Sequence, residues 1–203
     1  MDKSEKPIPE EYRMQVLQLT YAWEAMSRAH AMIDWLISVT QPPYQIQESA
    51  RDLYLACLTG FVANYARPFK KSEGLDKIIH GKSFKDLGLV EDEKVLDELH
   101  LNILLLRDKI LAHRDLNLKL NNDRSGGLVT SGDIRIQIDG DGYTWATNYP
   151  HVRAEYLPYW KRLVDAQLRR LDVAQEKVAM DLAEKYGPGE YVVRPASKKC
   201  NQA

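Results

Sequence analysis

Three residues of one predicted helix, Arg107, Asp108 and His113, have the side-chain types that phosphate chemistry requires. A histidine exchanges a proton near neutral pH, and an arginine presents a planar guanidinium that matches phosphate oxygens. Together they suit cleavage of an RNA phosphodiester. One group removes the proton of the ribose 2′-hydroxyl, and another stabilises the charge that develops on the phosphate. This chemistry needs no metal, and Asp108 would orient the arginine or the imidazole.

The helix that carries these residues presents them poorly to a single phosphate. Six residues of α-helix place Arg107 and His113 about 9 Å and about 120° apart. Two copies of the helix, meeting across a two-fold axis, would bring both pairs into one cleft, so the catalytic interpretation predicts a homodimer. His113 is also the next position of an apolar stripe with steps of three and four: Leu96, Leu99, Ile103, Leu106 and Ile110.

A purely structural interpretation of the same residues stands beside the catalytic one. A cationic imidazole at His113 would stabilise the C-terminal end of the helix dipole by about 0.3–1 kcal/mol. Arg107 and Asp108 would then be members of a surface ion pair. Spacing alone favours this interpretation, because one arginine and one histidine on a helix are a signal of low specificity.

The composition is that of a single globular domain with no global attraction to nucleic acid. The chain has 203 residues, 44% hydrophobic and 28% charged, with a formal net charge of −1. RNA binding would therefore need a local basic patch. The candidates, whose alternative role is that of solvated surface charges, are Arg67, Arg114, Lys161, Arg162, Arg169 and Arg170.

The periodicity of the chain predicts a mainly all-α fold, an up-and-down bundle of four to five helices with a small inserted β-hairpin. Helices are expected over residues 10–39, 45–66, the motif region and 151 or 158–186, with the hairpin at about 134–147. Residues 1–9 are expected to be a flexible N-terminus, 10–186 the helical domain and 187–203 a C-terminal tail. The first helix has a predicted buried stripe, in which the histidine is expected to be hydrogen-bonded in the core: Val16, Leu19, Trp23, Met26, His30, Ile33 and Ile37.

Several other classes of site and location are not supported by the sequence. Cys57 and Cys200 lack metal-binding spacing, and Cys57 is expected to be a buried thiol rather than half of a disulfide. The Asp139–Gly142 segment fits a hairpin turn and not a calcium loop, because the later ligand positions would be tyrosine and proline. No signal peptide and no apolar run of about 18 residues is present, so we expect a cytoplasmic protein without a membrane partner.

The segment LRDKILAHRD, residues 106–115, resembles the signature of the HEPN superfamily, in which an arginine and a polar residue precede a histidine by a few positions. The motif sequence is especially similar to that of HEPN proteins of abortive-infection and toxin–antitoxin systems, and NYARPF at 64–69 is also similar to that group. Asp108 stands where such proteins more often have asparagine.

The resemblance implies a dimerising helical bundle and a metal-independent endoribonuclease site, shared between protomers and without a cofactor. Arg107 would be the motif arginine, Asp108 the polar residue and His113 the motif histidine. A toxin or phage-defence effector with a cognate antitoxin protein would fit this group. Because fold membership does not settle activity, a non-catalytic module that binds RNA, nucleotide or a protein partner is the alternative.

Overall fold

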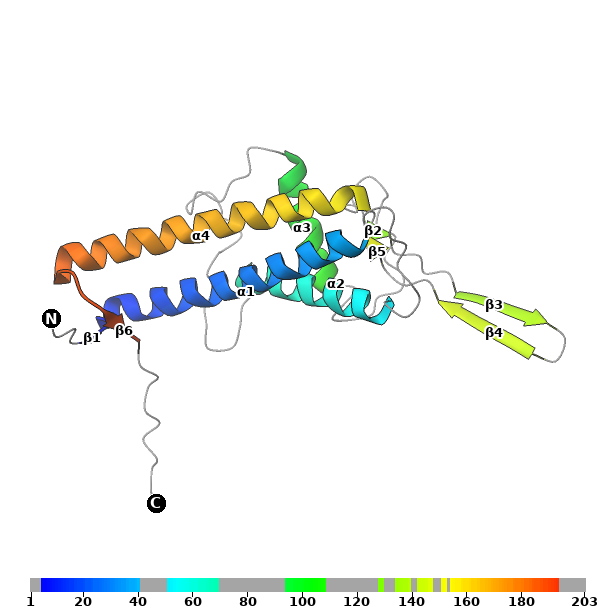
Figure 1. Cartoon of the computed structure of the whole chain (residues 1–203), viewed down its shortest axis with the longest axis horizontal. Coiled ribbons are helices and arrows are strands. Elements are labelled where there is room, and N and C mark those ends of the chain that lie inside the picture. The colour runs from blue at the N-terminus through cyan, green and yellow to red at the C-terminus, as the bar shows by residue number, and fades with distance from the viewer. Residues whose placement is uncertain are drawn as a thin grey trace, which may run out of the picture.

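Two long antiparallel helices form the frame of the molecule (Figure 1). The structure is a computed structural model that describes residues 5–40, 51–69, 94–108, 128–129, 134–139, 142–147, 151–152 and 154–193. Helix α1 spans Glu10–Thr40, and helix α4 spans Leu157–Tyr186, preceded by the short 3-10 turn η4 at Ala154–Tyr156. Both match the predicted helices closely. Helix α4 ends where Gly187 adopts a φ of 78°, a backbone conformation that favours glycine.

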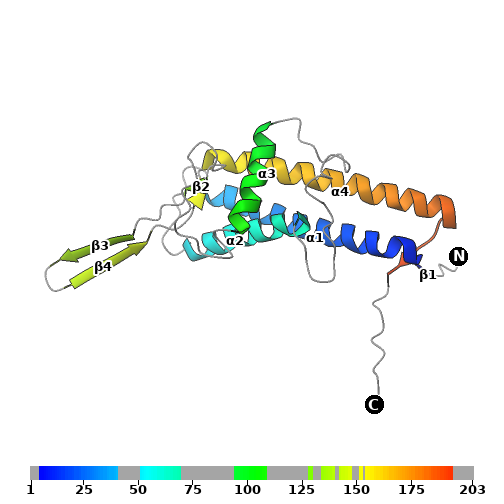
Figure 2. The same cartoon turned by 180° about the vertical axis from the view of Figure 1, so that it is seen from behind.

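Two shorter helices cover one side of this frame. Helix α2 spans Arg51–Ala66 and continues into the 3-10 turn η2 at Arg67–Phe69, while α3 spans Lys94–Leu106. Figure 2 shows α3 lying across the other helices on the outer side of the bundle. The predicted fold class, a mainly all-α helical bundle, is confirmed. The part of the predicted second helix before residue 51 lies outside the described residues.

The core forms where α1, α2 and α4 meet. Trp160 of α4 is fully buried and stacks on Phe61 of α2 with 5.1 Å between ring centroids. Small residues allow the helices to approach closely: Ala25 and Ala29 of α1 are buried, and a Cβ atom on Gly60 of α2 would lie 2.8 Å from the terminal methyl of Met32. Close packing of this kind makes the core intolerant of changes in volume.

The predicted buried stripe of α1 is wrong at Trp23. This side chain is 39% exposed, and its indole N–H donates a hydrogen bond of 2.9 Å to Asp172 Oδ1 on α4. The buried face of α1 is turned towards its alanines, because α2 packs on that side. His30 is correspondingly half-buried at the edge of the α1–α4 contact and not in the core.

The predicted hairpin is present as an antiparallel pair that extends away from the helices (Figure 1). Strand β3 spans Ile134–Asp139 and β4 spans Gly142–Thr147, and their register pairs Asp139 with Gly142 at the turn. A second, shorter antiparallel pair joins β2 (Leu128–Val129) to β5 (His151–Val152).

The two ends of the described chain pair with each other, which the sequence did not predict. Strand β1, Lys6–Pro7, runs parallel to β6, Tyr191–Val192, beside the N-terminal end of α1 and the C-terminal end of α4. Backbone hydrogen bonds from Lys6 N to Glu190 O and from Ile8 N to Val192 O hold this pair. Within the described residues, no helix has the length and apolar character needed to cross a membrane.

Candidate functional site

Arg107 and Asp108 directly follow α3, in a wider π-helical turn. The Arg107 Nη1 atom lies 3.0 Å from Asp108 Oδ1, and the two side chains are 46% and 37% exposed. The carboxylate therefore orients the guanidinium while leaving part of it open to solvent. A π-helical turn widens the backbone locally and occurs often at functional sites. The third motif residue, His113, lies outside the described residues.

The motif helix has a buried apolar face and an exposed face on which leucines stand beside the acidic residues Asp97 and Glu98. Leu96, Leu99, Ile103 and Leu106 are buried, as the stripe predicted. On the other side, Leu101 is 60% exposed and Leu105 is 37% exposed. On an ideal helix these two leucines and Asp108 lie within about 60° of one another. The two exposed leucines thus form a short strip that leads towards Asp108.

An aromatic cluster packs against the buried face of α3. His100 is only 4% exposed, and its Nδ1 atom lies 2.7 Å from the hydroxyl of Tyr65 on α2. The ring of Phe69 meets the imidazole edge-on, with centroids 4.7 Å apart. His100 therefore connects residues 65–69 to α3, the helix that leads to Arg107 and Asp108. No sequence signal indicated this contact, because the spacing of Tyr65 and His100 carries no helical or strand period.

The predicted RNA-binding residues that the structure describes lie on the turn η2 and on α4. The Arg67 guanidinium lies over the ring of Tyr21 on α1, 4.6 Å from its centroid. On α4, Arg162 and Arg169 are exposed, whereas Arg170 is half-buried. Arg114 lies outside the described residues.

Lys161 belongs instead to a charged cluster between α1 and α4. Its Nζ atom lies 2.5 Å from Asp34 Oδ1 and 2.9 Å from His30 Nε2. His30 also contacts Asp34 through Nδ1 at 3.2 Å and Asp165 through Nε2 at 3.0 Å. The opposite charges hold the two long helices in register. The i, i+4 pairs His30/Asp34 and Lys161/Asp165 were the available sequence signal for this cluster.

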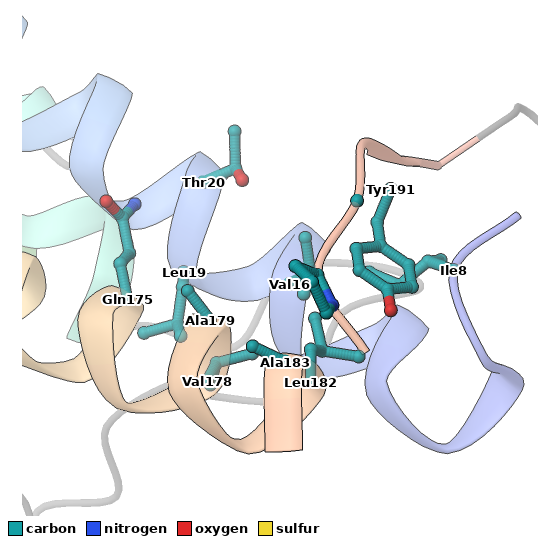
Figure 3. Close-up of a pocket in the computed structure, with 12 residues that line it drawn as sticks. Ile8, Val16, Leu19, Thr20, Gln175, Val178, Ala179, Leu182, Ala183 and Tyr191 are labelled. Atoms are coloured by element: carbon teal, nitrogen blue, oxygen red, sulfur yellow. The ribbon is translucent and has the colours of Figure 1, made fainter. Parts of the chain in front are cut away.

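A hollow lies elsewhere, between the N-terminal half of α1 and the C-terminal half of α4 (Figure 3). Its volume is about 540 Å³, and its wall is mainly apolar, with Val16, Leu19 and Leu182 among the residues that line it. Thr20 and Gln175 contribute polar groups. None of the predicted site residues lines it, and it contains no pair of groups suited to acid–base chemistry.

A reactive thiol and a metal centre find no support in the described part of the chain. Cys57 is half-buried rather than fully buried, and burial raises the pKa of its thiol, which opposes thiolate formation at neutral pH. Burial also raises the pKa of the Tyr54 hydroxyl, although the hydrogen bond from the Val152 amide partly opposes this. No cluster of three histidine, cysteine, aspartate or glutamate side chains among the described residues is arranged to hold a metal.

No family model, curated protein or solved structure matches this chain.

The charged cluster predicts different roles for two basic residues of α4. Replacing Lys161 by methionine leaves Asp34 without its ammonium partner and should lower the free energy of unfolding by about 1 kcal/mol, a small effect because the cluster is partly exposed. The matched change Arg169→Met, at an exposed position, should alter it by less than about 0.5 kcal/mol. Urea denaturation measures both, and equal losses would show that the cluster does not join the helices.

Proposed function

We propose that this chain is a HEPN-like, metal-independent endoribonuclease that acts as a homodimer. One observation carries the proposal: the carboxylate-oriented, partly exposed guanidinium of Arg107 stands at the end of a helix that has two exposed leucines on its outer face. The guanidinium suits a phosphate, and the strip suits a second copy of the chain. A cytoplasmic location fits an RNA substrate.

In the proposed reaction, the ribose 2′-oxygen attacks the adjacent phosphorus while a basic group takes its proton. His113 is the candidate for this proton transfer, or for delivery of a proton to the departing 5′-oxygen. Arg107 stabilises the additional negative charge on the phosphate oxygens, and Asp108 holds the guanidinium in place. The products are a 2′,3′-cyclic phosphate and a 5′-hydroxyl.

The proposal requires two copies because of helix geometry. Arg107 and His113 project about 120° apart from one regular helix, so a single helix does not direct both at one phosphate. The exposed strip at Leu101 and Leu105 would bring two motif helices together. Each phosphate would then meet groups from both protomers.

A second candidate function is a non-catalytic module that binds RNA, nucleotide or a protein partner. The ion pair between Arg107 and Asp108 favours it, because a guanidinium already matched to a carboxylate has less charge to offer a phosphate. In a toxin–antitoxin or phage-defence setting, an antitoxin protein would bind over the same exposed strip.

Cleavage of single-stranded RNA by the purified protein in the presence of EDTA tests the first candidate. Arg107→Ala and His113→Ala should each lower the rate at least about 100-fold, since each removes a group that acts in the transition state. Arg28→Ala, which removes an exposed arginine of α1 outside the candidate site, should cleave like the wild type. Equal cleavage by all four proteins would remove the assignment, and binding of RNA without cleavage would favour the second candidate.

The mass of the protein in solution tests the dimer. Leu101→Glu places a charge in the proposed interface and should give a monomer by sedimentation equilibrium. Leu53→Glu is the matched control, because Leu53 is a similarly exposed leucine on α2, 53% against 60% for Leu101. A wild-type monomer, or a Leu101→Glu dimer as stable as the control, would argue against this interface.

A further inference from the structure

We propose that Tyr65 and His100 are positioning residues, whose buried hydrogen bond fixes where α3 presents Arg107 and Asp108. The consequence for catalysis rests on the proposed function, whereas the anchoring of the helix does not. The proposed role of Tyr65 and His100 requires no contact with the side chains of Arg107 and Asp108. They act by fixing how α3 is rotated about its axis and where it lies along that axis.

The contact is directional and shielded from water. The Tyr65 hydroxyl lies 2.7 Å from His100 Nδ1, and the two residues are 0% and 4% exposed. Apolar contacts alone allow a helix to slide or turn, because hydrophobic burial has no preferred direction. A hydrogen bond weakens steeply when its angle departs from linearity, so it selects one rotation of α3 about its axis and one position along that axis.

The surrounding rings hold both partners in place. Phe69 meets the imidazole of His100 at an angle of 76°, with 4.7 Å between centroids, and lies 5.4 Å from the ring of Tyr65. The turn that carries Phe69 is itself attached to α1, through the cation–π contact of Arg67 with Tyr21. The hydrogen bond therefore links α3 to the long-helix frame.

The position of His100 along α3 transmits this constraint to the motif. Arg107 lies seven residues further on, and on a regular helix this spacing corresponds to about 10 Å along the axis and a difference in direction of about 20°. The buried residues between them, Ile103 and Leu106, provide apolar contacts. A small rotation of α3 at His100 would therefore move the guanidinium, and misplacement by about 1 Å is enough to lower catalysis strongly.

The test compares two buried tyrosine hydroxyls on the same helix. Tyr65→Phe keeps the ring and removes the hydrogen bond to α3. Tyr54→Phe removes a hydroxyl that accepts a hydrogen bond from the Val152 amide at 3.1 Å, away from α3. Tyr65→Phe should accelerate hydrogen exchange of the amides of residues 101–108 and lower kcat on RNA about tenfold with KM unchanged. Tyr54→Phe should change neither quantity.

Variants of His100 keep the proposal testable if Tyr65→Phe fails to fold. His100→Asn retains an acceptor near the position of Nδ1 and should preserve both the exchange rates and kcat, whereas His100→Leu should reproduce the effects expected for Tyr65→Phe. Equal exchange and equal kcat for the two tyrosine variants, or for the two histidine variants, would overturn the proposal. Faster exchange in Tyr65→Phe with no cleavage by the wild type would support the anchor and overturn the proposed function.

Discussion

A line of stacked and edge-on aromatic rings joins the helices that determine the shape of the molecule. Trp160 of α4 stacks on Phe61 of α2, and Phe61 lies 6.0 Å from Tyr65 one turn further along. Tyr65 contacts Phe69 and the imidazole of His100 on α3. Aromatic pairs at these distances contribute about 0.5–1.5 kcal/mol each beyond their burial. The placement of α3 depends on these rings, because His100 on its inner face packs against Phe69 and is hydrogen-bonded to Tyr65.

The same line explains why the motif is presented at the surface. With His100 and its apolar neighbours directed inwards, Leu101 and Leu105 lie on the outer face of α3, and the helix ends in the partly exposed pair Arg107 and Asp108. The long helices, held together by the core and by their charged cluster, provide a rigid base for this arrangement. The buried contacts that hold α3 in place are therefore concentrated on its inner face.

The local elements of the fold were predictable from the sequence, whereas the contacts between them were not. Periodicity located the long helices and the hairpin because helix and strand repeats are visible within a short window. It failed at Trp23, since the buried face of α1 depends on where α2 packs. The Tyr65–His100 contact and the engagement of Lys161 by Asp34 join distant segments, and residue type alone does not pair them. The contact between Arg107 and Asp108 joins neighbours in the sequence, and their proposed role in a site stays a prediction.

The central claim of this account is that one RNA phosphate meets groups from two copies of the chain. Mixing the Arg107→Ala and His113→Ala proteins, after exchange of their subunits, tests this claim most directly. Half of the dimers would then be mixed, each with one intact pair, so about a quarter of the wild-type cleavage rate should return although each variant alone is inactive. A mixture as inactive as its components, with subunit exchange verified, would contradict the account.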